Sequence, residues 1–227
     1  FSGGANVGVN IESENVICID KNESLINLMN FIKTLSYDNL INMLEDKISY
    51  YNLSDSFRNG YEFYGCNSSN GLGKYNKQGF DKLKQDYNKS KDNVLFLLLI
   101  IFGFNNQIRF NRKGDFNLPV GKRDLNSSLR KKLRLFIERI KNKKISFICK
   151  DFRQLDIKSL ANDNAFLYLD PPYILGTATY NENGGWTEKD EVDLLSFLQE
   201  CDVAGIRFAL SNVMVHKGVT HDLLLQW

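Results

Sequence analysis

In the stretch "LYLDPPY", residues 167–173, an apolar run ends at Asp170, which directly precedes two consecutive prolines. A proline has no backbone N–H and restricts the residue before it to extended conformations, so the chain leaves a predicted strand at 166–169 in a stiff turn. The carboxylate of Asp170 and the ring of Tyr173 are then held beside the carboxyl end of a strand, where open α/β sheets bind ligands. A binding site and an ordinary Asp-Pro turn both fit these residues.

The segments around this turn predict the fold class. Short apolar runs at 16–20, 146–150, 166–169 and 206–210 have the length of buried strands. A helical pattern follows the first strand at 23–35, and another lies at 187–201, with Thr187 as the expected N-cap and acids in the first turn. Strands that alternate with helices predict an α/β fold with a mostly parallel, doubly wound sheet.

Residues 36–145 interrupt this alternation. They are polar, rich in Asn, Lys and Tyr, and contain two helical patterns and one turn-rich stretch. We therefore predict an inserted, mainly helical domain at 36–145 and a second domain made of 1–35 and 146–227. The apolar run at 94–104 is too short for a membrane-spanning helix, so we expect a buried segment there and no membrane partner.

Charge and cysteine usage narrow the class of protein. The formal net charge is +2, but residues 109–150 contain fourteen Lys or Arg against three acids. Such an excess indicates a polyanionic partner, although a helix with a solvated basic face gives the same pattern. The four cysteines have neither metal-ligand spacing nor a disulfide framework, which predicts reduced thiols in a cytoplasmic protein and no metal site.

Two motifs indicate chemistry. The glycine-rich stretch "FSGGANVGVN", residues 1–10, precedes the strand that ends at Asp20, and an acid in that position can accept hydrogen bonds from both hydroxyls of a ribose. Without a Lys-Ser or Lys-Thr ending, a triphosphate ligand is disfavoured. At the proline turn, Asp170 and a proline carbonyl can accept both hydrogens of an exocyclic amine while Tyr173 stacks on its ring. Held this way, the amine nitrogen can attack an electrophilic carbon in line.

A glycine-rich turn, a strand that ends in an acid, an inserted basic domain and "LYLDPPY" follow one another along the chain. In this order they resemble the motifs of the Dam-type DNA adenine methyltransferases. The resemblance implies a Rossmann-like S-adenosylmethionine-dependent methyltransferase sheet with an inserted DNA-recognition domain, and methyl transfer to the N6 amine of a flipped adenine in double-stranded DNA. It implies catalytic roles for Asp170, Pro171, Pro172 and Tyr173. It implies cofactor contacts for Phe1, Ser2, Gly3, Gly4, Asp20, Phe152 and Asp170.

A third stretch, "FGFNNQIRFNRKGDFNLPVG" at 102–121, is similar to the segment with which that family enters DNA. By this resemblance Phe104 would intercalate, Asn105 would contact the orphaned base or its backbone, and Arg109 would read a guanine edge. Pro119 matches a residue that touches a thymine methyl group. The DNA contacts that the resemblance implies are Phe104, Asn105, Gln107, Arg109, Asn111, Arg112 and Pro119.

The sequence departs from the family in several places. Gln107 stands where GATC-specific members carry an apolar residue, so the recognised sequence stays open, and Ala5 stands where glycine is usual. The chain begins at Phe1 and ends at Trp227, inside the family's pattern, so we expect a fragment. Residues 176–186 have the composition of a mobile loop that could close over the flipped base, or of an ordinary surface loop.

The biological setting follows from the resemblance alone. It implies a cytoplasmic protein of a bacterium or phage, belonging to a restriction and modification system or to a related housekeeping enzyme. A cognate restriction endonuclease would then act separately on the same sequence. Two alternatives remain: methylation of another exocyclic amine, in RNA adenine or at cytosine N4, and a DNA-binding module that has lost catalysis.

Overall fold

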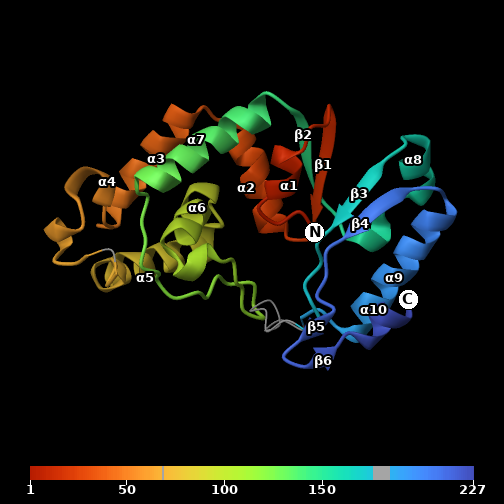
Figure 1. Cartoon of the computed structure of the whole chain (residues 1–227). Coiled ribbons are helices and arrows are strands. Elements are labelled where there is room, and N and C mark those ends of the chain that lie inside the picture. The colour runs from red at the N-terminus through yellow and green to blue at the C-terminus, as the bar shows by residue number, and fades with distance from the viewer. Residues whose placement is uncertain (68, 176–184) are drawn as a thin grey trace. The chain divides into compact units, whose positions relative to one another are not determined.

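Helices and strands are mixed throughout the computed structural model, which describes residues 1–67, 69–175 and 185–227 (Figure 1). The chain divides into two units. The first contains Phe1–Gly8, Ile17–Glu23 and Phe147–Trp227, and the second contains Val9–Val16 and Ser24–Ser146. Each unit is described below by itself.

A strand–helix–strand element forms the centre of the first unit. Strand β3 (Phe166–Leu169) pairs in parallel with β4 (Arg207–Leu210), and α9 (Glu188–Val203) connects them and lies beside the pair (Figure 1). Both strands and the helix confirm the sequence prediction. Apolar side chains from α9 and β3 share one core with the aromatic residues that precede them. The buried members are Phe152, Leu169, Trp186, Leu194, Phe197, Leu198, Cys201 and Ile206.

The remaining strands form separate small sheets in the described residues. The predicted strands at 16–20 and 146–150 are present as β1 (Asn15–Asp20) and β2 (Lys144–Cys149), which neighbour each other in a two-stranded sheet. A short antiparallel pair joins β5 (Val215–His216) to β6 (Val219–Thr220). The mixed helix and strand composition is therefore present, whereas the single doubly wound sheet stays a prediction.

Short helices complete the first unit. They are α1 (Asn6–Asn10), which continues into the second unit, η3 (Phe152–Gln154), α8 (Ile157–Asn162) and α10 (Asp222–Gln226). The glycine-rich stretch, expected only as a turn, thus becomes helical from Asn6 onward.

Thr187 caps α9 as predicted, within a capping box. Its hydroxyl accepts a hydrogen bond from the backbone N–H of Asp190 at 3.2 Å, and Asp190 Oδ2 accepts one from the Thr187 N–H at 2.9 Å. Arg153 adds ion pairs to Asp190 at 2.7 Å and to Asp193 at 2.8 Å. Burial alone would raise the pKa of Asp190, but the Thr187 hydrogen bonds and the Arg153 charge outweigh it and lower the pKa to about 2.

This lowered pKa predicts a pH-dependent stability contribution. Because the folded-state pKa lies below the ordinary value of 3.8, the contribution is fully present above about pH 4 and is lost as the pH falls toward 2. Urea unfolding at pH 6, 4, 3 and 2.5 should therefore show that Asp190→Asn loses its disadvantage against the wild type as the pH falls. The exposed neighbour Glu188 provides the control variant Glu188→Gln. A constant difference at every pH would contradict the prediction.

Helices dominate the second unit. Its elements are α2 (Glu23–Thr34), α3 (Tyr37–Tyr50), α4 (Ser56–Asn59), η1 (Glu62–Tyr64), α5 (Gly73–Ser90), α6 (Asn93–Phe102), η2 (Phe104–Asn106) and α7 (Ser127–Lys141). Helix α2 confirms its prediction. Helix α3 lies beside α7 and contacts α6, which in turn packs on α5 (Figure 1).

The expectation of two helical patterns within 36–145 was wrong, because four long helices, α3, α5, α6 and α7, are present there. Helix α5 shows how weak such a pattern can be in the sequence, because Lys, Asn, Asp and Gln surround its few buried apolar residues, Phe80, Leu83 and Tyr87. Helix α6 confirms the expected buried segment, since eight of its ten residues are buried. In the described part of the chain, no helix combines the length and apolar character needed to cross a membrane.

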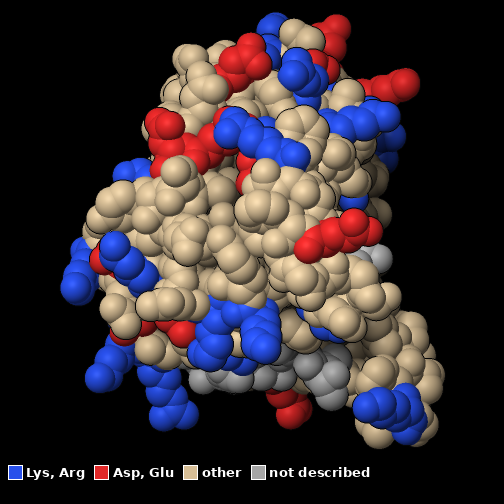
Figure 2. All heavy atoms as spheres, turned by 90° about the vertical axis from the view of Figure 1, so that its left-hand side faces the viewer, with Lys and Arg blue, Asp and Glu red and all other residues tan. Residues whose placement is uncertain are grey.

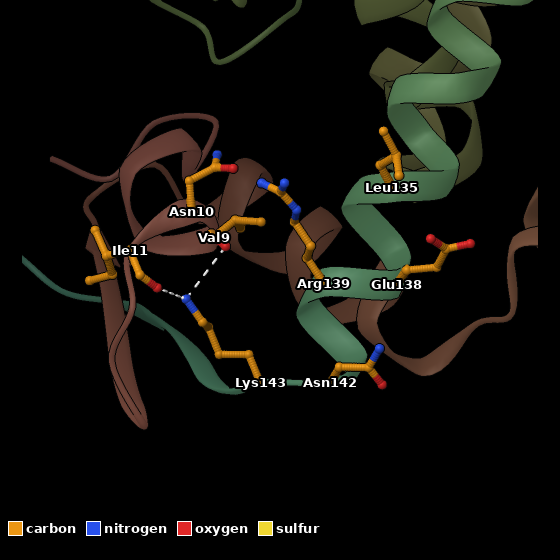
Figure 3. A pocket seen from close by; sticks show the side chains of 8 residues that line it. All are labelled: Val9, Asn10, Ile11, Leu135, Glu138, Arg139, Asn142 and Lys143. Carbon is orange, nitrogen blue, oxygen red and sulfur yellow. Dashed lines mark hydrogen bonds between the residues drawn. The ribbon is translucent and has the colours of Figure 1, made fainter.

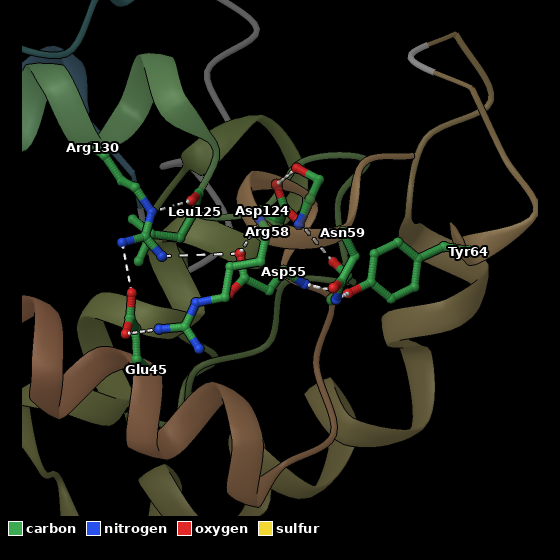
Figure 4. Close-up of polar contacts among 10 residues, drawn as sticks. Glu45, Asp55, Arg58, Asn59, Tyr64, Asp124, Leu125 and Arg130 are labelled. Carbon is green, nitrogen blue, oxygen red and sulfur yellow. Dashed lines mark hydrogen bonds and ion pairs between the residues drawn. The ribbon is translucent and has the colours of Figure 1, made fainter. Parts of the chain in front are cut away.

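A buried polar network joins three segments of the second unit (Figure 4). Asp124 is fully buried, and its carboxylate accepts hydrogen bonds from Ser54 Oγ at 3.1 Å, from the Ser56 N–H at 2.7 Å and from Ser56 Oγ at 2.6 Å. The equally buried Asn76 bonds to the backbone and hydroxyl of Ser54. Because each buried polar group has a partner, the network fixes the segment that leads into α4.

The basic stretch is partly used inside the protein. Arg130 of α7 is buried and donates to Glu45 Oε1 at 2.8 Å, while the guanidinium of Arg134 lies 4.0 Å from the ring centre of Tyr37. One face of the molecule shows Lys and Arg interspersed with Asp and Glu around a broad uncharged area (Figure 2). Fewer positive charges are therefore free to bind a polyanion than the number of basic residues in the sequence indicates, because some of these residues stabilise the fold.

Candidate functional site

The proline turn holds Asp170 and Tyr173 together at the end of β3. Pro171 is buried, Pro172 is half-buried, and Asp170 is exposed. The Tyr173 hydroxyl donates to Asp170 Oδ1 at 2.8 Å and lies 3.0 Å from Ser211 Oγ. Ser211 follows β4, and its N–H donates to the carbonyl of Leu169 at 2.8 Å, which continues the ladder between the two strands. The parallel pairing thus brings a third side chain to the turn.

These contacts set the protonation of Tyr173. The hydrogen bond with Ser211 lowers its pKa, but the hydrogen bond to Asp170, partial burial and the negative charge of Asp170 together raise it above the ordinary value of 10. The phenol is therefore neutral near pH 7 and acts as a hydrogen-bond donor to the carboxylate. Sequence reasoning missed this role of Ser211, because the contact depends on the register of β4 against β3.

The glycine turn, Asp20 and the segment after β2 meet in the first unit. The Gly3 N–H donates to Asp20 Oδ2 at 2.9 Å, the Asn22 N–H donates to Asp20 Oδ1 at 2.9 Å, and the Lys150 N–H donates to the Asp20 carbonyl at 3.1 Å. Each carboxylate oxygen keeps a further lone pair for a ligand. The expected turn and acid are therefore adjacent in space.

Backbone conformation explains why a glycine would suit position 5. Ala5 has φ +57°, in the left-handed region, and Gly3 has φ +46°. The left-handed conformation raises the free energy of a residue that has a Cβ by about 1–2 kcal/mol, whereas glycine adopts it without this cost. Ala5 is also buried, and its N–H donates to the Ser2 carbonyl at 2.7 Å. The turn keeps its shape with alanine, at a cost in local strain.

Three aromatic rings lie beside this turn. The ring centre of Phe1 is 5.4 Å from that of Phe152 and 5.3 Å from that of Trp186, which it meets edge to face. Phe152 is 6 % exposed and belongs to the core of the unit. The aspartates near it have structural partners, since Asp151 pairs with Arg153 and caps η3 while Asp156 caps α8. Sequence reasoning placed Trp186 in the expected loop and missed its contact with Phe1.

The expected mobile loop falls on residues 176–186, and positions 176–184 lie outside the described residues. The proposal that this loop closes over a flipped base therefore stays a prediction. Of its residues, Gly185 and Trp186 are described, and Trp186 is buried.

The predicted DNA segment forms an irregular antiparallel loop after α6. Isolated bridges join Gly103 to Val120 and Phe110 to Phe116, and the Phe104 N–H donates to the Pro119 carbonyl at 3.0 Å. Gly121 permits this close approach, because a Cβ there would lie 2.5 Å from the Gly103 carbonyl oxygen. The loop therefore places Phe104 and Pro119 next to each other, and Phe104 is 47 % exposed.

Arg109 is held in place within the same loop. Its Nε donates to Asn117 Oδ1 at 2.8 Å, and its Nη2 donates to the Asn117 carbonyl at 3.1 Å. Asn105 is exposed with φ +53°, Gln107 is half-buried, and Arg112 is exposed in the turn at the tip. The side chain of Asn111, expected to contact DNA, also builds that turn by accepting from the Lys113 and Asp115 N–H groups.

A pocket of about 460 Å³ lies elsewhere in the second unit, where the end of α7 faces the end of α1 (Figure 3). Lys143 points into it and donates to the carbonyls of Val9 and Ile11. None of the predicted site residues lines this pocket, so it is given no role. The described residues also contain no group of three or more His, Cys, Asp or Glu suited to a metal ion.

Comparison with known proteins identifies relatives over the whole chain. The family model described as "D12 class N6 adenine-specific DNA methyltransferase" matches residues 1–224. The chain is 35% identical over 233 residues to "Type II methyltransferase M.FokI" of Planomicrobium okeanokoites, and 32% identical over 233 residues to "Modification methylase StsI" of Streptococcus sanguinis, covering 100% of this chain and 33% of each relative. It is 29% identical over 181 residues to "DNA adenine methylase" of Serratia marcescens, covering 80% of this chain and 58% of that protein. The chain thus spans about a third of the length of the first two.

Proposed function

Because the chain belongs to the D12 class of N6 adenine-specific DNA methyltransferases, we propose that the protein containing it methylates the N6 amine of adenine at a specific sequence in double-stranded DNA. S-adenosylmethionine is the proposed methyl donor. Residues 1–35 and 146–227 would form a Rossmann-like catalytic domain, and 36–145 would form the inserted recognition domain. The contact of Tyr173 with Asp170 beside two parallel strands is the observation that carries the proposal.

The residues of the glycine turn fit the proposed cofactor. Ser2 Oγ is buried and makes no hydrogen bond with the described residues, so a polar ligand group would satisfy it. Asp20 offers lone pairs on both carboxylate oxygens to a ribose, and the half-buried ring of Phe1, which packs on Phe152, offers aromatic surface to an adenine ring. Gly3 and Gly4 are exposed and leave the backbone open to the methionine part.

Asp170 and Tyr173 would act on the target amine. When bound, S-adenosylmethionine supplies an electrophilic methyl group. Asp170 and the carbonyl of Pro171 or Pro172 would accept the two amine hydrogens, so that the nitrogen lone pair leaves the ring plane and faces the methyl carbon. The carboxylate would also stabilise the positive charge that develops on nitrogen, which lowers the barrier because that charge exists mainly in the transition state. Tyr173 would stack on the flipped base.

The recognition segment gives a prediction about sequence preference. Arg109→Ala should relax the preference at one base pair by about 1–3 kcal/mol, because a bidentate arginine–guanine contact discriminates by that amount. Lys113→Ala, at an exposed cation in the same loop, should weaken binding equally for all sequences. Binding to a panel of duplexes with single substitutions measures both. A uniform loss with Arg109→Ala would instead identify Arg109 as a phosphate contact.

The names of the relatives support a setting as well as a reaction. Proteins called type II methyltransferase and modification methylase suggest a role beside a restriction endonuclease that acts separately, in the cytoplasm of a bacterium or of a phage-infected cell. The test is to incubate the full-length protein with S-adenosylmethionine and unmethylated genomic DNA and to map N6-methyladenine at single-base resolution. One recurrent methylated motif is expected. Cofactor binding without modified adenine would overturn the proposed substrate.

A further inference from the structure

A buried carboxylate with no part in the proposed reaction lies in the first unit. Glu191 of α9 is 0% exposed, and its two oxygens receive three hydrogen bonds. Oε1 accepts from Asn212 Nδ2 at 2.9 Å and from His221 Nε2 at 3.1 Å, and Oε2 accepts from the indole N–H of Trp186. A buried charge is costly unless donors surround it, so this carboxylate fixes Trp186, five residues before it, and two segments further along the chain, at Asn212 and His221.

The hydrogen bonds also determine what residue 191 must be. The Leu224 N–H donates to His221 Nδ1 at 3.2 Å, and a ring nitrogen that accepts carries no hydrogen. The ring hydrogen of His221 therefore lies on Nε2 and is directed at Glu191. Asn212, His221 and Trp186 are then all donors. A carboxylate satisfies them with two acceptor oxygens, whereas the amide of a glutamine would place an NH₂ group against one of them.

Two of these donors lead to the candidate site. Asn212 directly follows Ser211, whose hydroxyl contacts Tyr173 at the proline turn. The ring centre of Trp186 lies 5.3 Å from that of Phe1 and 6.2 Å from that of Phe152. One buried carboxylate thus constrains both the strand end that holds Tyr173 and the rings beside the glycine turn.

We propose that Glu191 is a positioning residue for methyl transfer. It holds Ser211 against Tyr173 through Asn212, and it holds the aromatic rings at Phe1 and Phe152 through Trp186. The positioning role in catalysis rests on the function proposed above, whereas the mechanical link from Glu191 to Tyr173 does not.

The isosteric variant Glu191→Gln tests the proposal. Turnover (kcat) should fall about tenfold or more, since small displacements of reacting groups have effects of that size or larger. KM for DNA should change by less than about twofold, because the proposed DNA contacts lie in another segment. Glu188→Gln, which removes an exposed acid from the same helix, is the matched control and should leave both values unchanged.

A spectroscopic signal reports the link without reference to activity. Tyrosine labelled with ¹³C at the ζ carbon gives one resonance per residue, and Tyr173→Phe assigns that of Tyr173 by its disappearance. The Tyr173 resonance should shift in Glu191→Gln and stay in place in Glu188→Gln. Asn212→Ala removes one donor to the Glu191 carboxylate and should shift the same Tyr173 resonance. This variant tests the link if Glu191→Gln does not fold.

Recovery of turnover by a second substitution distinguishes a positioning role of Glu191 from a general packing role. Trp186→Phe removes the indole N–H that would oppose the glutamine amide and keeps an aromatic ring beside Phe1. The double variant of Glu191→Gln and Trp186→Phe should therefore recover turnover relative to Glu191→Gln alone. A folded Glu191→Gln or Asn212→Ala protein with an unshifted Tyr173 resonance and wild-type kcat would overturn the proposal. A wild-type protein that methylates no adenine, together with a shifted resonance in the variants, would reject the function and leave the link established.

Discussion

Asp170→Ala is expected to reduce methyl transfer by about 10³-fold or more while DNA binding persists. The carboxylate is the proposed acceptor for the target amine and the stabiliser of its developing charge, and losing one preorganised electrostatic partner has effects of this order. Asp170 is exposed, and Tyr173 keeps its second contact, to Ser211, so the fold should survive. Single-turnover transfer from labelled S-adenosylmethionine, with a binding titration on the same duplex, measures the two effects separately.

The control for this variant is Asp163→Ala, because Asp163 is an exposed acid of the first unit located before β3. It should have wild-type turnover and wild-type DNA affinity. Turnover by Asp170→Ala at the control rate would remove Asp170 from the mechanism. A parallel loss of DNA affinity in Asp170→Ala would mean that the residue serves binding instead of the chemical step.

The second large effect concerns stability. Asp124→Ala should lower the free energy of unfolding by about 3 kcal/mol, because it leaves the hydrogen-bonding groups of Ser54 and Ser56 unsatisfied in a buried site and removes packing volume. The exposed acid Asp46 on α3 supplies the control Asp46→Ala, for which a change within about 0.5 kcal/mol is expected. Urea unfolding monitored by circular dichroism gives both values.

A loss as small as that of the control would show that water replaces the carboxylate in this network. Equilibrium unfolding of Asp124→Asn refines the result, since an asparagine keeps the volume and one acceptor oxygen. Its free energy of unfolding should lie between those of the wild type and Asp124→Ala.

Local sequence signals predicted the elements that local chemistry controls. The prolines after 166–169, the cap at Thr187 and the apolar run at 94–104 each identified a boundary or a buried segment that the structure contains. Helix α5 has a weaker signal, because polar residues surround its narrow apolar stripe and its boundaries become clear only once its packing partner α6 is known.

Contacts between distant residues were beyond the sequence. Ser211 reaches Tyr173 only through the register of two parallel strands, and Glu191 gathers donors from positions 186, 212 and 221. In the sequence, Arg130 counts among the basic residues of a helix with a solvated face or a polyanionic partner, but Arg130 forms a buried ion pair with Glu45. Strand register decides the first contact and burial decides the other two, and residue identity alone gives neither.

The two hydrogen bonds from Arg109 to Asn117 bear on how the proposed recognition segment would discriminate against a wrong base pair. An unrestrained arginine carries about 2 kcal/mol of rotamer entropy, and a flexible one can swing toward another acceptor when the base is wrong. Arg109 is restrained at Nε and Nη2 before any DNA arrives. The ordering cost therefore falls on folding, and if Arg109 reads a base pair as proposed, a mismatched pair would meet a guanidinium that is already held in place. Discrimination at that base pair would then depend on how firmly the DNA-free protein holds the Arg109 side chain, as well as on the contact between Arg109 and the base.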